Sequence, residues 1–163
     1  MIPLSIPRAI FEELWKYAEE RGVSIEGLLV EIATQGMDPG DRAKKYIEAS
    51  LELLEQAREE LNKGDLRQAS EKIWNAAALA IKAYAFWKEG KVLSKHTDLW
   101  SYKSVIAKEL GEWVRISWLI ADAMHKNFYE GEADKNDIIK ALEEVEKLVK
   151  AIAKRIKLAP STK

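Results

Sequence analysis

The residues best suited to chemistry lie together near the end of one predicted helix, around His125. Asp122 lies about one helical turn before His125, so its carboxylate can hydrogen-bond the imidazole. A carboxylate in this position orients a histidine as a general base, although it also repels a phosphate. We therefore take His125 and Asp122 as candidate catalytic residues, with Arg115 as the nearest arginine upstream.

The same stretch also has the composition of a ligand site that performs no reaction. Lys126, Asn127 and Tyr129 follow His125 and supply a cation, an amide and a hydroxyl group. These four side chains are our candidate ligand-binding residues. A third interpretation stays open, in which His125 is structural and interacts with the dipole at the C-terminal end of its helix.

Other kinds of site are disfavoured by the residue counts. The chain has no cysteine, and its two histidines, His96 and His125, lie in different segments, so no metal site is expected. No glycine-rich loop follows a predicted strand, which excludes the common nucleotide-binding loops. We therefore expect no cofactor. His96 precedes a helix and is expected to pack or cap.

The chain of 163 residues is 47% hydrophobic and 33% charged, which indicates a folded globular protein. No apolar run approaches the ~20 residues that a bilayer span needs, and the N-terminus does not resemble a secretory signal. We expect a cytoplasmic protein that does not contact membranes. The net charge of −1 gives no overall attraction to nucleic acid.

The body of the chain alternates apolar stripes at helical spacing with glycine breaks. The stripes predict an all-α, up-down antiparallel bundle of five main helices within residues 41–158, followed by a frayed tail at 159–163. The predicted helices cover residues 41–62, 65–88, 97–110, 112–128 and 137–157. The second is alanine-rich, so a neighbouring helix can approach it closely.

Residues 1–40 read as a separate appendage with a short extended opening and two helices, at about 9–20 and 24–33. This order resembles a ribbon-helix-helix DNA-binding module, which raises the alternative of a DNA-binding regulator acting through residues 1–36. The alternating sets Ile2, Leu4, Ile6 and Pro3, Ser5, Pro7 contain no base-reading side chain. The appendage also carries a net charge of −4, which opposes the approach of DNA phosphates, so we do not expect DNA as a partner.

Three pieces of the body resemble the archaeal PaREP family. They are GDLRQASEKIWNAAALAIKA at 64–83, SKH at 94–96 with the nearby Leu99 and Trp100, and MHKNFYEG at 124–131. Members of that family resemble HEPN (higher eukaryote and prokaryote nucleotide-binding) domains. This resemblance implies a helical bundle that is usually dimeric, with RNases, toxins and non-catalytic partners of nucleotidyltransferases among its relatives.

Catalytic HEPN proteins carry an arginine, four to six further residues and then a histidine, for phosphate charge and proton transfer. The matching positions before His125 hold Trp118, Leu119 and Ile120, none of which is basic. The resemblance thus predicts a homodimeric interaction module or a nucleotide- or RNA-binding module without the standard catalytic motif. A nucleotidyltransferase-type protein is a candidate partner. The alternative is a metal-independent endoribonuclease using His125.

Overall fold

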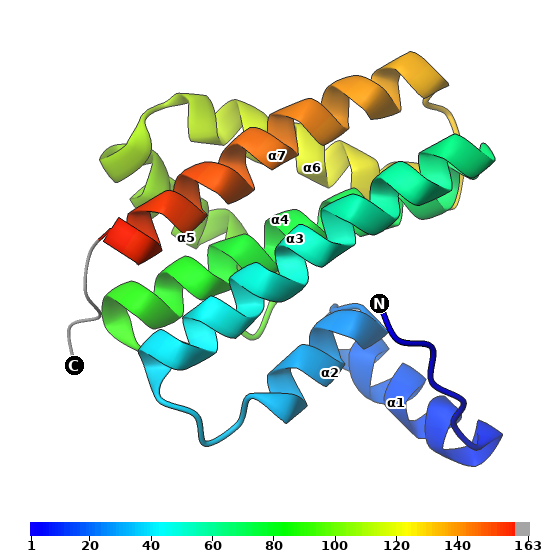
Figure 1. Ribbon diagram of the computed structural model, residues 1–163, viewed down its shortest axis with the longest axis horizontal. Helices are drawn as coiled ribbons and strands as arrows, with labels where there is room; N and C mark the ends of the chain where they lie inside the picture. The colour runs from blue at the N-terminus through cyan, green and yellow to red at the C-terminus, as the bar shows by residue number, and fades with distance from the viewer. Residues whose placement is uncertain (159–163) are drawn as a thin grey trace.

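The computed structural model describes residues 1–158, and the predicted tail at 159–163 lies outside them. Every regular element within this range is a helix (Figure 1). The prediction of an all-α bundle with a small N-terminal helical pair is confirmed. The elements are α1 (Arg8–Arg21), α2 (Ile25–Ala33), α3 (Pro39–Lys63), α4 (Leu66–Glu89), α5 (His96–Leu110), α6 (Trp113–Glu130) and α7 (Lys135–Leu158).

Helix α4 is the centre of the bundle and packs against α3, α5, α6 and α7. Its closest association is with α3, which lies beside it along almost its whole length (Figure 1). Small buried side chains, including Ala76, Ala77 and Ala80, allow this approach. The Ser50 hydroxyl of α3 donates a hydrogen bond of 2.7 Å to the Ala76 carbonyl oxygen of α4.

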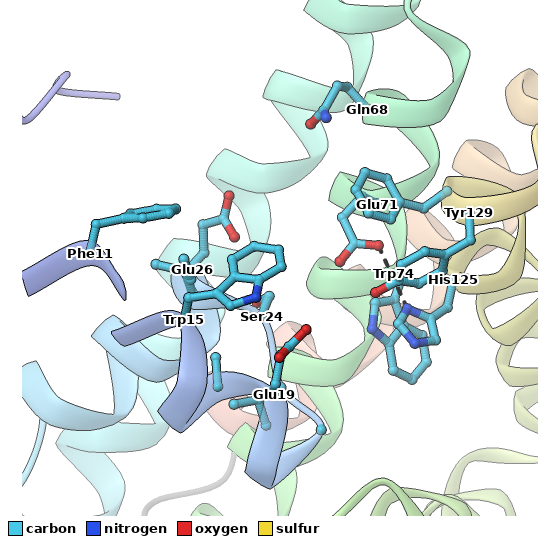
Figure 2. Close-up of a pocket in the computed structure, with 15 residues that line it drawn as sticks. Phe11, Trp15, Glu19, Ser24, Glu26, Gln68, Glu71, Trp74, His125 and Tyr129 are labelled. Atoms are coloured by element: carbon cyan, nitrogen blue, oxygen red, sulfur yellow. Dashed lines mark ion pairs between the residues drawn. The ribbon is translucent and has the colours of Figure 1, made fainter. Parts of the chain in front are cut away.

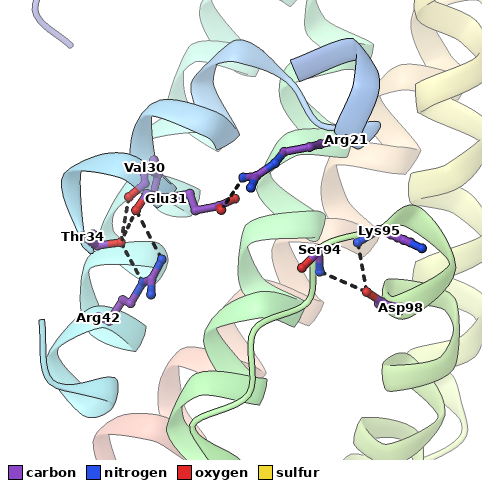
Figure 3. A network of polar contacts seen from close by, with 8 residues as sticks. All are labelled: Arg21, Val30, Glu31, Thr34, Arg42, Ser94, Lys95 and Asp98. Carbon is purple, nitrogen blue, oxygen red and sulfur yellow. Dashed lines mark hydrogen bonds and ion pairs between the residues drawn. The ribbon is translucent and has the colours of Figure 1, made fainter. Parts of the chain in front are cut away.

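The ends of the helices follow local sequence signals. Gly64 has φ 83°, a left-handed conformation that ends α3 and that other residues adopt at a cost. The Asp65 carboxylate then accepts a hydrogen bond from the Gln68 N–H at 3.0 Å, which starts α4 as predicted. At the start of α5, the Asp98 carboxylate accepts from the backbone N–H groups of Ser94 and Lys95, both at 3.0 Å (Figure 3).

The N-terminal pair is attached to the bundle through polar contacts and through apolar side chains of α2, of which Leu28 is fully buried and Val30 packs against the core. Arg42 of α3 donates to two groups at the C-terminal end of α2 (Figure 3). They are the Thr34 hydroxyl, at 2.9 Å, and the Glu31 carbonyl oxygen, at 3.2 Å. Lys72 of α4 forms an ion pair of 2.6 Å with Glu26 of α2. Helix α1 packs mainly on α2, so these contacts set the position of the whole pair.

No helix within residues 1–158 combines the length and the hydropathy needed to cross a lipid bilayer.

Candidate functional site

A cavity of about 680 Å³ separates the N-terminal pair from the bundle, and His125 lies in its wall. Helix α1 supplies one side, while α4 and the last two turns of α6 supply the other (Figure 2). Much of the lining is aromatic. These aromatic side chains are Phe11, Trp15, Trp74, Phe128 and Tyr129.

His125 faces a carboxylate that the sequence analysis did not select. Its Nδ1 atom lies 3.6 Å from Oε2 of Glu71 on α4 (Figure 2). Both atoms are buried, and neither has a hydrogen-bond partner in the structure. The Trp74 ring lies 4.8 Å from the His125 ring, and Tyr129 contacts it edge-on with centroids 5.7 Å apart. The cavity wall therefore contains an imidazole–carboxylate pair enclosed by aromatic rings.

The predicted pairing of Asp122 with His125 is wrong. Asp122 Oδ1 lies 3.2 Å from Nε2 of His96, the first residue of α5. Asp122 and His125 are three residues apart on α6, so their side chains point in directions that differ by about 60° around the helix axis. Two different neighbouring helices can therefore each contact one of them. Trp100 also donates its indole N–H to His96 Nε2 at 3.0 Å. Asp122 and His96 thus belong to the α5–α6 contact.

Arg115 does not approach His125. Its guanidinium donates to the Glu112 carboxylate at 2.6 Å and to the Ser104 hydroxyl at 3.0 Å. It lies ten positions before His125 on α6, a distance of about 15 Å along the helix axis. Trp118, one of the positions where a catalytic arginine was sought, is fully buried.

The four candidate ligand-binding residues separate into two groups. His125 and Tyr129 line the cavity. Asn127 is buried, with its amide N–H donating to the Ser70 hydroxyl at 2.8 Å and its carbonyl oxygen accepting from the Ala133 N–H at 2.7 Å. Lys126 is exposed and lies 3.7 Å from Asp122. The structure brings neither Asn127 nor Lys126 into the cavity.

Several cavity residues were missed because they come from other elements. Glu71 and Trp74 lie one turn apart on α4, within the stretch at 64–83 that resembles the PaREP family. That stretch was the available signal, but nothing in it indicates which side chains face His125. Phe11 and Trp15 of α1 reach the cavity only because α2 is tied to α3 and α4.

The cavity is electrostatically negative. Glu19, Glu26 and Glu71 line it, His125 is the one basic side chain among the lining residues, and Lys72 neutralises only Glu26. Partial burial raises the pKa of Tyr129, and the negative charges of Glu71 and Glu19 raise it further. Burial and these two carboxylates thus both disfavour a negative charge on Tyr129 at the cavity edge.

Comparison with protein families adds an independent result. The model of the archaeal PaREP1/PaREP8 family matches residues 45–149, which include most of the bundle. The chain belongs to this family. The predicted membership is confirmed, and the match includes Glu71, Trp74 and His125 but not α1 or α2.

A solved structure agrees with this assignment. The crystal structure of a Sulfolobus solfataricus protein resembles the chain with a TM-score of 0.58 and 28% sequence identity. The similarity covers 65% of this PaREP1/PaREP8 chain and 94% of the other. No curated protein matches the chain. The comparisons therefore establish the family and the fold.

The different placement of Asn127 and Lys126 predicts different effects of truncating them. Asn127→Ala leaves the Ala133 N–H and the Ser70 hydroxyl without these partners, and we expect a loss of about 1–3 kcal/mol in the free energy of unfolding. Lys126→Ala, the matched control on the exposed side, should change it by less than about 0.5 kcal/mol. Urea denaturation followed by circular dichroism measures both. Equal stability of the two variants would contradict a structural role for Asn127.

Proposed function

We propose that this protein is a binding module in which the cavity at His125 holds a small aromatic ligand. The observation that carries the proposal is the facing pair His125 and Glu71, buried without hydrogen-bond partners in an aromatic wall. Ligand pockets typically combine an apolar lining with a few polar groups that fix orientation, within about 300–1,000 Å³. This cavity has both the size and the lining of such a pocket.

The charges of the cavity favour a ring over a phosphate group. Three carboxylates line the cavity, and the basic side chain nearest to His125 in sequence, Lys126, points elsewhere. A phosphate at the cavity would meet these carboxylates at close range, where charges interact strongly because water is partly excluded. If the ligand is the predicted nucleotide or RNA, these charges favour binding of an unpaired base and oppose binding of the sugar–phosphate backbone.

Endoribonuclease activity is supported less well. Standard chemistry needs a cation beside the histidine to stabilise charge on the phosphate. Here Glu71 faces His125, and Arg115 is engaged by Glu112 and Ser104. The negative neighbour would oppose the charge that develops during cleavage.

We also propose that two copies associate through residues 1–32. Of the thirteen large apolar side chains that are exposed within residues 1–158, nine belong to this stretch. A concentration of exposed apolar surface of this kind is typical of an interface. The nine are Met1, Ile2, Leu4, Ile10, Phe11, Trp15, Tyr17, Leu29 and Ile32.

The backbone of residues 1–7 supports a second copy as the partner. The segment is non-helical, and residues 1–6 make no backbone hydrogen bonds within the described part of the chain. In a strand, alternate residues present their N–H groups to the same edge. Pro3, Ser5 and Pro7 share one edge, and because the two prolines lack an N–H, only Ser5 can donate a hydrogen bond there. Ile2, Leu4 and Ile6 share the other edge, and all three keep their N–H donors.

Such a segment can pair fully along one edge only. Two copies related by a twofold axis at Leu4 would form an antiparallel ribbon, with Ile2 opposite Ile6 of the second copy. The proline edge then limits the addition of further strands. The ribbon carries no arginine, asparagine or glutamine, so the alternative of DNA reading through residues 1–36 has little support from these side chains.

Binding in the cavity can be tested with the neutral aromatic dye N-phenyl-1-naphthylamine, which fluoresces in apolar surroundings. We expect a saturable fluorescence increase with wild type. Trp15→Ala should weaken dye binding about fivefold, because an aromatic contact is worth about 1 kcal/mol. Leu119→Ala removes an exposed apolar side chain outside the cavity and should have no effect. Unsaturable binding, or equal affinity of the Trp15 variant, would refute the cavity as the site.

The nuclease alternative predicts a different outcome with RNA. We expect purified protein to leave mixed RNA intact in EDTA, and His125→Ala to behave like wild type, because no cation lies beside His125 to stabilise the phosphate. Gel electrophoresis against a known metal-independent RNase gives the readout. Cleavage by wild type that His125→Ala abolishes would overturn the proposal in favour of an endoribonuclease.

The ribbon can be tested by cross-linking, because the chain contains no native cysteine. Leu4→Cys places two thiols opposite each other at a Cα separation of about 5.5 Å, within the range of a disulfide, so mild oxidation should give a covalent dimer. In Ile2→Cys, the control, the two thiols lie about 14 Å apart and should not cross-link. Sedimentation of wild type, which has no thiol, should show a dimer. A monomer, or equal cross-linking of both variants, would contradict the ribbon.

A further inference from the structure

The carboxylates of the cavity come from three separate elements around the aromatic walls (Figure 2). Glu19 lies on α1, Glu26 on α2 and Glu71 on α4. Glu26 is neutralised by Lys72 at 2.6 Å. The Glu71 Oε2 atom is buried and faces His125 Nδ1 at 3.6 Å. Glu19 and the other Glu71 oxygen, Oε1, on opposite sides of the cavity, are the acceptors left for a ligand.

We propose that the cavity ligand is an organic cation, with a protonated amine attached to a flat aromatic body. This inference rests on the proposed binding function and specifies the class of ligand. The ammonium group would donate to Glu71 and lie within the field of Glu19. The aromatic body would stack against Trp15, which is 47% exposed, while Tyr129 borders the opposite side of the cavity.

The aromatic lining strengthens the preference for a cation. The face of an aromatic ring carries partial negative charge and attracts a cation, most strongly for tryptophan. Trp15 lines the cavity with part of its ring exposed and Tyr129 lies at the edge, whereas Trp74 is buried against His125. The aromatic rings and the carboxylates therefore both attract a cation. A neutral ligand gains neither attraction.

The same charges oppose the binding of an anionic ligand. The raised pKa of Tyr129 arises partly from Glu71 and Glu19, so the field that opposes a phenolate there would oppose any ligand carboxylate or phosphate. His125 is the one lining residue able to favour an anion, and Glu71 already faces it at 3.6 Å.

A metal ion fits the cavity less well than an organic cation. Within residues 1–158, no three histidine, cysteine, aspartate or glutamate side chains are grouped closely enough to hold a metal. Divalent cations need several oxygen or nitrogen ligands at short distances. An ammonium ion needs fewer contacts and brings an apolar body that fills the aromatic part of the cavity.

Three small ligands of similar shape and different charge separate these possibilities. They are 2-phenylethylamine, which is cationic near neutral pH, the neutral 2-phenylethanol and the anionic phenylacetate. Isothermal titration calorimetry on the full chain gives the affinities. We expect the amine to bind at least about tenfold more tightly than the alcohol, since charge-assisted hydrogen bonds are about twice as strong as neutral ones. Phenylacetate should bind most weakly.

Substitutions of single carboxylates test whether the preference for the amine arises in the cavity. Glu71→Gln keeps the shape but removes the charge, so the amine should lose most of its advantage while the alcohol binds as before. Glu19→Gln should reduce the advantage by a smaller factor, since Glu19 is exposed to solvent. Glu20→Gln, the adjacent exposed residue of α1 outside the cavity lining, is the matched control and should leave the order unchanged.

The outcomes distinguish this inference from the proposed function. If the amine and the alcohol bind equally, or Glu71→Gln leaves the amine's advantage intact, the cation inference fails while the cavity remains a binding site. Tighter binding of phenylacetate would also overturn it. If none of the three ligands binds and the naphthylamine dye does not bind either, both the inference and the proposed function fail. Circular dichroism of each variant identifies any loss of folding.

Discussion

The structure depends on the burial of α4 among four other helices. Its alanine-rich middle allows α3 to approach closely, while larger buried side chains fill the spaces toward the other helices, as Tyr84 does against Tyr102 of α5. This coverage is less complete over the first two turns, where Gln68 is exposed and Glu71 is only partly buried. The cavity lies where α4 is no longer enclosed by the bundle, and the N-terminal pair approaches there.

A buried polar contact fixes the other wall of the cavity. Asn127 joins the end of α6 to the Ser70 hydroxyl of α4 and to the backbone after α6. The Ser70 hydroxyl in turn donates to the Leu66 carbonyl oxygen at 2.7 Å. Satisfied buried hydrogen bonds hold a single geometry, because breaking them leaves polar groups without partners. Asn127 thereby sets the position of His125, two residues earlier, opposite Glu71.

The N-terminal pair reaches the cavity by a different kind of attachment. Lys72 and Arg42 link it to the bundle and Val30 packs against the core, but nine large apolar side chains of residues 1–32 remain exposed. An element held in this way keeps an apolar surface available for association. Helix α1 can thus line the cavity with Trp15 and also take part in the proposed contact with a second copy. The family match at residues 45–149 leaves this pair outside it, so the cavity joins a family element to one beyond the match.

The helices and most of their ends could be predicted from sequence, because they depend on local patterns. Gly64, Asp65 and Ser24 act within one turn of their own positions, and the apolar stripes identify the buried faces. The same local reasoning placed Asp122 beside His125 and Asn127 in a ligand site. In the structure a neighbouring helix supplies the partner of each side chain, which is His96 for Asp122 and Ser70 for Asn127.

The sequence by itself therefore determined an all-α bundle, its family, and the place of His125 near the end of a helix. Only the tertiary structure decided that His125 faces Glu71, that Asp122 faces His96, and that Trp15 completes the cavity. The physical reason is that helix formation is governed by interactions a few residues apart. The partner of a side chain on a helix surface depends instead on how separate helices pack, across 54 residues for Glu71 and His125.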